Sequence, residues 1–503
     1  MKKILTANRG EIACRVIRAC RELDIQTVAV YSDVDRKSLH VQMADEAIFI
    51  GPPPPLESYL NINSIVDAVK KTQSDAIHPG YGFLAENPAF AKRCEEEDIP
   101  FIGPSSETLH LVGDKIASRK TVQREGIPII PGMVQKGFDL QNLKMDAKRF
   151  GYPVIVKAAL GGGGKGMRIV HSEEELLKSV EAGMREAKGA FGDETIYLEK
   201  YLERPRHIEF QILADKNGNV VHLFERECSI QRRHQKIVEE TPSTALTREL
   251  REKMGESAIR VAKACNYTHA GTVEFLLDQE GNFYFLEVNA RIQVEHPVTE
   301  WTTGVDLVRE QIRIAMGEPL PFKQEDLKQR GHAIECRIYA EDPENNFLPS
   351  PGPILFLKEP SGPGIRHDSG IYNGWEVPSH YDPILSKLIT WGETREVARK
   401  RMTTALNDLV ILGIETTVDF LKDVMKHPEF IQGRTTTDFI ERNMKDWKER
   451  KSDSGLEEAL IAGAIYSYLK EGKGKSQIVN LQSPISQPSP WLTVGKWELG
   501  EKK

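Results

Sequence analysis

Several features are scarce or missing in this sequence of 503 residues, and each absence excludes a class of protein. No apolar run approaches the roughly 20 residues that a membrane-spanning helix needs, so we expect no membrane partner. There is no block of basic residues, and a net charge of −7 gives no electrostatic footprint for nucleic acid. The six cysteines include no CxxC pair, and no signal peptide precedes them. These observations predict a cytoplasmic protein with reduced thiols in its core.

Two common nucleotide-binding motifs are also missing. The first predicted strand–helix turn reads Asn8-Arg9-Gly10-Glu11, which lacks the GxGxxG of dinucleotide-binding folds, although Asp33 could be a ribose reader. A later glycine run ends in Lys165, but Ala159 and Gly166 stand where a P-loop needs glycine and serine or threonine. The sequence therefore argues against a dinucleotide site and against a P-loop enzyme.

The composition, with 40% hydrophobic and 28% charged residues, is that of a soluble globular enzyme. A chain of this length is too long for a single core, so about two to four domains are expected. The first hundred or so residues alternate strands and helices, which predicts an α/β fold that begins with a doubly wound parallel sheet. After Leu348 the chain is rich in proline, glycine and short strands, and residues 446–455 have the charged composition of a linker.

The most informative stretch is Phe283 to Glu300, which reads FYFLEVNARIQVEHPVTE. It begins as a strand that would pair with residues 271–277 in a hairpin. Each strand carries one carboxylate in an apolar run, Glu274 and Glu287, and alternation places Asn289 on the same face as Glu287. Two carboxylates and an amide oxygen form a site suited to Mg²⁺ carrying nucleotide phosphates. The alternative is a structural ion pair of Glu287 with Arg291.

The residues that follow suggest an anion-binding site. Arg291, Gln293, Glu295 and His296 alternate with Ala290, Ile292 and Val294 as in a strand that ends at Pro297. An arginine, an amide and a carboxylate would then converge beside the proposed metal ion. Such a combination can hold a small anion and activate it.

Three more segments carry groups suited to a nucleotide. Lys157 lies in a predicted strand before the glycine loop, whose N–H groups can approach phosphate oxygens, although a bare hairpin with a flexible tip fits the glycines equally well. The strand at residues 195–202 ends in polar groups that could contact adenine. A short basic patch runs from Gln231 to Lys236, for which a solvated loop is the alternative.

Six motifs occur in unbroken order along the chain: NRGEIA, HPGYGFLAEN, the glycine loop with its lysine, RHQK, EVNARIQVEHPVTE and HAIECRIYAEDP. Together they resemble biotin carboxylase, of the ATP-grasp superfamily, over about residues 1–447. Lys165 stands where some members of that family have arginine. The resemblance implies a Rossmann-like domain at 1–114 and an ATP-grasp domain at 115–330 with its lid at about 131–203. A β-rich C-terminal domain at 331–447 and a partner-docking tail at 448–503 would follow.

The resemblance also implies roles for individual residues. ATP would be bound by Lys115, Lys157, Gly162, Gly163, Gly164, Lys165, Glu199, Lys200, Leu202, His207, Gln231 and His234. The metal ligands would be Glu274, Glu287 and Asn289. Bicarbonate would lie against Lys236, Arg291, Gln293, Val294 and Glu295, with Glu295 as its general base. Biotin would contact Arg337, Tyr81 and Gly82, and the catalytic set would be Glu295, Arg291, Lys236 and Arg337.

The implied activity is carboxylation of biotin by bicarbonate through carboxyphosphate, with ATP and Mg²⁺ or Mn²⁺. No Ala-Met-Lys-Met motif for biotin attachment occurs in this sequence, and the residues after 447 are too few for a carboxyltransferase. We therefore expect a homodimer that works with a separate biotin carboxyl carrier protein and a carboxyltransferase subunit. The tail, with a helix from Leu456 to Lys470 and with Trp491 and Trp497, would dock the partner or else pack on its own domain.

Two rival interpretations remain open on the residues alone. Another ATP-grasp carboxylate–amine ligase, or a carbamoyl-phosphate-forming enzyme, shares the paired carboxylates and the glycine loop but does not need the RHQK and RIQVEH motifs. A non-catalytic nucleotide sensor would be expected to lose Lys157, Glu287 or Arg291, and all three are present. The sequence does not indicate the final acceptor of the carboxyl group.

Overall fold

The computed structural model describes residues 1–135, 140–158, 167–191, 194–233, 235–448, 463 and 465–466. The chain divides into two compact units, Met1–Lys448 and Glu449–Lys503, and nearly all described residues belong to the first. His234, the glycine loop at 161–166 and almost all of the predicted tail helix and tail lie outside the described residues.

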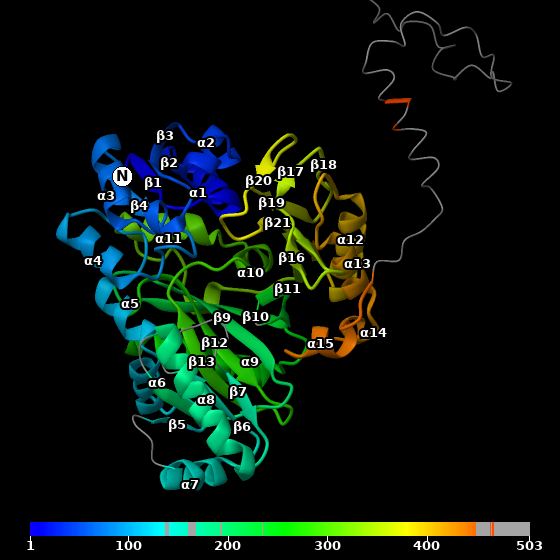
Figure 1. Cartoon of the computed structure of the whole chain (residues 1–503). Coiled ribbons are helices and arrows are strands. Elements are labelled where there is room, and N and C mark those ends of the chain that lie inside the picture. Colours follow the sequence, from blue (N-terminus) through cyan, green and yellow to red (C-terminus); the bar gives the residue numbers. More distant parts are fainter. Residues whose placement is uncertain are drawn as a thin grey trace, which may run out of the picture. The chain divides into compact units, whose positions relative to one another are not determined.

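The first part of the chain folds around a parallel sheet with the strand order β3-β2-β1-β4 (Figure 1). Its strands are β1 (Lys3–Thr6), β2 (Gln26–Ser32), β3 (Glu46–Gly51) and β4 (Ala76–His78). The predicted parallel α/β unit is thus confirmed. Strand β3 was not predicted, because only Ile50 of its residues is buried at this sheet edge, so the strand shows no buried pattern. Beyond these strands, Phe101 adds a single parallel bridge with Ile77.

Three helices connect the strands of this sheet: α1 (Gly10–Glu22), α2 (Leu39–Met43) and α3 (Ile62–Thr72). The chain continues after β4 with α4 (Pro88–Glu96), α5 (Ser106–Gly113) and α6 (Lys115–Arg124). Two short 3₁₀ turns lie between them, η1 (Asp33–Asp35) and η2 (Pro55–Glu57). Asn61, Asn87 and Ser105 cap α3, α4 and α5 by accepting backbone N–H groups, as short polar side chains do at helix starts.

The acidic turn after β2 has a structural role in this fold. Asp35 is fully buried, and both its oxygens accept hydrogen bonds at 2.7 Å from the Arg9 guanidinium. Ser38 and Tyr59 donate to the same carboxylate. Burial alone would raise the pKa of Asp35, but Arg9 outweighs it and lowers the pKa to about 2. The carboxylate is therefore saturated by protein donors.

Replacing Asp35 with asparagine should destabilise the protein by about 3–5 kcal/mol, because the buried Arg9 charge loses its partner. The lowered pKa means that this stability is present above about pH 4 and is lost as the pH falls toward 2. Urea-unfolding midpoints of Asp35→Asn and the parent should therefore differ more at pH 7 than at pH 3. Asp33→Asn is the matched control, since its side chain is 52% exposed and should hardly change the midpoint. An equal effect of both substitutions would contradict the role of Asp35.

A second, separate sheet lies within the range predicted as the lid. It is antiparallel, with the order β5-β8-β6-β7. Its strands are β5 (Gly132–Gln135), β6 (Val154–Ala158), β7 (Arg168–Val170) and β8 (Ile196–Lys200). Helices α7 (Leu140–Phe150) and α8 (Glu173–Phe191) pack on it, and Leu143, Val156 and Leu176 belong to its own apolar core. The domain boundaries themselves stay a prediction.

The largest sheet has eight strands, all antiparallel, in the order β13-β12-β9-β10-β11-β14-β21-β19 (Figure 1). These are β9 (Arg206–Ala214), β10 (Val220–Arg232), β11 (Gln235–Thr241), β12 (His269–Leu277), β13 (Phe283–Asn289), β14 (His332–Tyr339), β19 (Ile365–Ser369) and β21 (Ile384–Gly392). The solvated-loop interpretation of residues 231–236 is wrong for the described strand residues, because Gln231 and Arg232 belong to β10 and Gln235 and Lys236 belong to β11. The sheet is also continuous across residue 330, where a domain boundary was predicted.

The remaining elements surround this sheet. The helices are α9 (Arg248–Ala264), α10 (His296–Thr303), α11 (Leu307–Ala315), α12 (Arg395–Asp408), α13 (Val418–Lys426), α14 (Pro428–Ile431) and α15 (Phe439–Asn443), with the turn η3 (Gln324–Asp326). The short strands are β15 (Glu341–Asp342), β16 (Leu348–Pro349), β17 (Gly352–Pro353), β18 (Phe356–Lys358), β20 (Glu376–Val377) and β22 (Val410–Leu412). The β-rich C-terminal part is thus confirmed.

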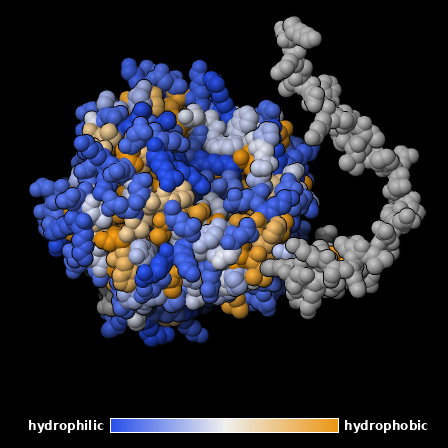
Figure 2. All heavy atoms as spheres, turned by 90° about the horizontal axis from the view of Figure 1, so that it is seen from above, coloured by the Kyte–Doolittle hydropathy of each residue, from blue (hydrophilic) through white to orange (hydrophobic). Residues whose placement is uncertain are grey.

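The surface drawn in Figure 2 is mainly hydrophilic, with apolar patches scattered over it. One exposed apolar group lies where β18 pairs with β22, and consists of Leu355, Phe356 and Leu412. Among the described helices, none is long and apolar enough to cross a membrane.

Candidate active site

The two carboxylates of the predicted hairpin lie directly opposite each other. Glu274 on β12 pairs with Glu287 on β13, and Thr272 pairs with Asn289, which confirms the predicted hairpin. Burial and the neighbouring Glu274 raise the pKa of Glu287, although Lys115 opposes this. Two facing carboxylates in a buried place form a site that a cation would stabilise.

The segment after β13 is not a strand. β13 ends at Asn289, and the chain then passes through a loop into α10, with Pro297 in its first turn. The predicted alternation of residues 290–296 is therefore wrong, although the polar groups still converge. Arg291 forms an ion pair with Glu86 at 2.9 Å and donates to Asn289 at 3.2 Å. The alternative of a structural ion pair between Arg291 and Glu287 is therefore wrong.

Lys236 is the centre of the charged cluster. Its ammonium contacts Glu209 at 2.5 Å and both Glu274 and Glu295 at 2.8 Å. Burial alone would lower the pKa of Lys236, but these carboxylates raise it well above its ordinary value. The side chain is thus a permanent cation that joins Glu274, one of the two hairpin carboxylates, to Glu295.

A β-bulge in β11 gives the cluster its shape. Ile230 pairs with Val238 and Gln231 pairs with Lys236, so Ile237 is an extra residue in the ladder. On a regular strand Lys236 and Glu239, three residues apart, would point to opposite faces. The bulge turns both toward the same charged cluster, a common use of bulges next to active sites.

Arg337 lies between two carboxylates. Its Nε donates to Glu239 at 2.6 Å and its Nη2 donates to Glu295 at 2.9 Å. Burial tends to raise the pKa of Glu295, but Lys236 and Arg337 outweigh it and lower the pKa. Glu295 is therefore ionised at neutral pH and able to accept a proton. Burial instead raises the pKa of Glu239 to about 7.

Further predicted nucleotide residues form two groups. Glu199 accepts hydrogen bonds from Lys157 and from Arg119, each at 2.5 Å, while Lys200 donates to backbone carbonyl groups on the turn before β6. His207 lies 3.2 Å from Glu274 and contacts Gln231 at 3.1 Å. Burial alone would lower the pKa of His207, but the Glu274 carboxylate outweighs burial and raises the pKa to about 9. Lys115 begins α6 and Leu202 follows β8.

The predicted biotin residues lie where the N-terminal and C-terminal parts of this unit meet. The Tyr81 hydroxyl donates to Glu11, whose other oxygen is 3.2 Å from Lys387. Lys387, fully buried on β21, also donates to the Val294 carbonyl at 2.9 Å. Gly82 has a φ of +68°, with open space where a Cβ would lie. Tyr81 and Val294 are thus linked through two buried charged residues.

Three family descriptions match successive parts of the chain. They are the biotin carboxylase N-terminal domain at residues 1–109, the carbamoyl-phosphate synthase L chain ATP binding domain at 114–323, and the biotin carboxylase C-terminal domain at 335–442. A pyruvate carboxylase subunit from Methanothermobacter thermautotrophicus is 54% identical over 87% of this chain and 89% of its own length. Biotin carboxylase of Nostoc is 53% identical over 88% of this chain and 99% of its own length.

The chain belongs to the biotin carboxylase family. The biotin carboxylase domain of 2-oxoglutarate carboxylase from Hydrogenobacter thermophilus, solved as a dimer with MgADP, ADP and bicarbonate, has the same fold. The TM-score is 0.85 at 50% identity, over 90% of this chain and 99% of that one. The relatives include carboxylases named for two different acids, pyruvate and 2-oxoglutarate, so the family does not fix the final acceptor.

Four residues of the candidate active site were not predicted from the sequence: Glu209, Arg226, Glu239 and Glu86. Glu209 and Glu239 are fully buried strand residues. A glutamate inside an alternating strand was the signal in the sequence that could have indicated them. Arg226 contacts groups from two other strands, a loop and a helix, which no local pattern indicates. Glu86 lies in the HPGYGFLAEN motif, about two hundred residues before its partner Arg291.

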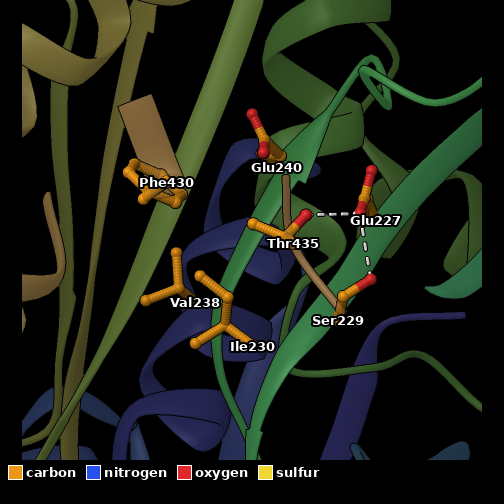
Figure 3. A pocket seen from close by; sticks show the side chains of 7 residues that line it. All are labelled: Glu227, Ser229, Ile230, Val238, Glu240, Phe430 and Thr435. Atoms are coloured by element: carbon orange, nitrogen blue, oxygen red, sulfur yellow. Dashed lines mark hydrogen bonds between the residues drawn. The ribbon is translucent and has the colours of Figure 1, made fainter. Parts of the chain in front are cut away.

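A small pocket between β10, β11 and α14 is structural rather than catalytic (Figure 3). It is lined by Glu227, Ser229, Ile230, Val238, Glu240, Phe430 and Thr435. Glu227 accepts hydrogen bonds from Ser229 and Thr435 inside the pocket and also from Arg206 and Ser243. Glu240, the other acid that lines the pocket, accepts from Arg395 with both oxygens, so neither acid is free for a ligand.

Proposed function

We propose that the Lys236 cluster carries out the ATP-dependent carboxylation of biotin by bicarbonate. The observation that carries this proposal is the Lys236 ammonium, which contacts Glu274 of the carboxylate pair and Glu295 at the same distance of 2.8 Å. A metal-bound phosphate and a bicarbonate ion would thereby be held next to each other. Positioning and charge neutralisation are the main contributions that a protein makes to phosphoryl transfer.

In the first stage, bicarbonate lies against Lys236, Arg291, Gln293 and the Val294 backbone. Glu295 accepts the bicarbonate proton while a bicarbonate oxygen forms a bond to the γ-phosphorus and the bond to ADP breaks. The lowered pKa of Glu295 supports this role, because a base must be ionised before it can accept a proton. The products are carboxyphosphate and ADP.

In the second stage, carboxyphosphate separates into CO₂ and phosphate, and phosphate takes the ureido proton of biotin. Arg337 stabilises the oxyanion of the biotin enolate, whose nitrogen then forms a bond to CO₂. The Arg337 guanidinium already lies 2.9 Å from Glu295, which supports the two stages sharing one site. Tyr81 and Gly82 border the biotin position.

Mg²⁺ or Mn²⁺ would be held by Glu274, Glu287 and Asn289. The pKa of Glu287, raised by burial and by the facing Glu274, fits a site completed by a cation. When bound, the ion would neutralise charge on the ATP phosphates. Lys115, Lys157, His207, Gln231 and His234 would supply the remaining nucleotide contacts, together with Glu199, Lys200, Leu202 and the loop residues Gly162, Gly163, Gly164 and Lys165.

The partners follow from the same chemistry. Biotin would be presented by a separate carrier protein, and carboxybiotin would pass to a carboxyltransferase subunit. A homodimer is supported by the dimer of the Hydrogenobacter domain. All six cysteines are buried and unpaired, which supports a reducing, cytoplasmic location.

The direct test is ATP hydrolysis by the purified chain with Mg²⁺. We expect hydrolysis that depends on bicarbonate and that free biotin stimulates, with carboxybiotin formed. Equal rates with and without bicarbonate, in a well-folded preparation, would contradict the proposal. Stimulation by ammonia instead of biotin would indicate a carbamoyl-phosphate-forming enzyme.

A further inference from the structure

Arg226 has no role in the chemistry described above, yet it is the largest fully buried side chain of the described residues. Its Nε donates to Glu209 at 2.5 Å, and its Nη1 donates to Gln211 and Thr299 at 2.7 and 3.0 Å. Its Nη2 donates to Thr272 at 3.0 Å and to Gln293 at 2.9 Å. A guanidinium has five N–H groups, so every donor of Arg226 is used.

These contacts fix the orientation of the Gln293 amide. Arginine has no acceptor atom, so the group of Gln293 that faces Arg226 must be the oxygen, Oε1. The opposite end of the amide, Nε2, donates to Glu274 at 3.0 Å. The same Glu274 oxygen also accepts from the Lys236 ammonium at 2.8 Å, so the group of Gln293 that faces it must be a donor. Both neighbours therefore demand the same orientation.

We propose that Arg226 is a positioning residue that makes Gln293 an N–H donor toward bicarbonate. This inference rests on the proposed function, in which Gln293 is part of the bicarbonate site. With Oε1 held by Arg226 and one N–H bonded to Glu274, the amide has its second N–H left to present to the anion, beside the Lys236 ammonium. A freely turning amide would also present its carbonyl oxygen, which repels an anion.

Arg226 acts on the same site through a second contact. Glu209 divides its two oxygens between Arg226 and Lys236. The guanidinium thus fixes the acid that helps to orient the Lys236 ammonium. Arg226, a buried cation on β10, thus positions two donors to bicarbonate: Gln293 on the loop before α10 and Lys236 on β11.

Replacing Arg226 with lysine keeps the charge near Glu209 but removes the fork that reaches Gln293. We expect the KM for bicarbonate in ATP cleavage to rise about 10- to 100-fold, the usual effect of losing one hydrogen bond to a charged group. The KM for ATP should change little. An unchanged KM for bicarbonate in folded Arg226→Lys would overturn the proposal.

Thr299→Val is the matched control. It removes one acceptor from the same guanidinium, but at Nη1, and leaves the Nη2 contact with Gln293 in place. It should lower the melting temperature without raising the KM for bicarbonate. If both variants raise that KM equally, the effect is general loosening of the core and the proposal fails.

A double-mutant cycle tests whether Arg226 acts through Gln293. Gln293→Met should raise the KM for bicarbonate, and adding Arg226→Lys should then raise it by much less than in the parent. Should Arg226→Lys not fold, Gln293→Glu still tests the orientation. It keeps an oxygen for Arg226 but places a second one toward the anion, so it should weaken bicarbonate binding more than Gln293→Met. An equal or smaller effect would overturn the assigned orientation.

Different results would contradict the role of Arg226 and the biotin carboxylase activity. If the parent protein shows no bicarbonate dependence, the function is wrong, whatever the variants do. If the parent depends on bicarbonate and Arg226→Lys does not alter its KM, only the role of Arg226 is wrong. Line broadening of ¹³C-bicarbonate by parent and variants gives a measure of binding that is independent of turnover.

Discussion

Glu295→Gln is expected to turn over about 10²–10⁴-fold more slowly than the parent, the usual contribution of a positioned general base. The substitution removes the proton acceptor but keeps an oxygen that can accept from Lys236 or Arg337. Lys236 also retains Glu209 and Glu274, so the cluster keeps a charge partner for its ammonium. The variant should therefore fold and bind Mg-ATP as the parent does. Steady-state ATP cleavage with saturating bicarbonate gives the rate.

Glu300→Gln is the matched control for this experiment. Glu300 is also a buried glutamate of the α10 region, paired with Arg15 at 3.0 Å and Arg366 at 2.7 Å. It should cost stability but leave the turnover number close to that of the parent. If Glu295→Gln keeps nearly full activity, another group removes the bicarbonate proton. If both variants lose activity alike, the loss reports on the packing of α10 and not on catalysis.

Arg337→Met should reduce biotin carboxylation by about 10²–10³-fold, the range seen when one donor to a developing oxyanion is removed. Bicarbonate-dependent ATP cleavage should fall less, because Arg337 acts on the enolate in the second stage. It should not be spared completely, since Arg337 also contacts Glu295 and lowers its pKa. The two activities, measured side by side on one preparation, give the ratio.

Identical losses in both activities would refute this division of roles between the stages. Arg337→Lys is the control, because it keeps a cation between Glu239 and Glu295 but loses the planar fork. It should recover part of the ATP cleavage and less of the carboxylation. A complete recovery of both would mean that only charge, and not the geometry of the guanidinium, matters at this position.

Local patterns in the sequence were sufficient for the elements whose physics is local. The β12–β13 hairpin and the facing pair Glu274 and Glu287 followed from the alternation of side chains, because strand register is set over a few residues. The parallel sheet at the N-terminus followed from alternating strands and helices. The resemblance to biotin carboxylase then supplied roles that no pattern in the chain could give.

Local patterns failed where the outcome depended on distant contacts. Residues 290–296 alternate like a strand, but the loop into α10 is fixed by Glu86 and Arg226, which come from other parts of the chain. Residues 231–236 were open to interpretation as a polar loop, yet Arg232 and Lys236 are strand residues whose charges are paired with Glu341 and Glu209. A hydrophilic composition cannot reveal a partner that lies far away in the sequence.

The sequence by itself determined the α/β class, the hairpin with its two acids and the family of the chain, since these depend on short-range periodicity and on motif order. Only the tertiary structure decided that Lys236 joins Glu209, Glu274 and Glu295, that the bulge at Ile237 turns Glu239 toward Arg337, and that Arg226 holds Gln293. The physical reason is that a buried charge is stable only beside a partner. Those partners are brought together by the folding of strands that lie up to about a hundred residues apart.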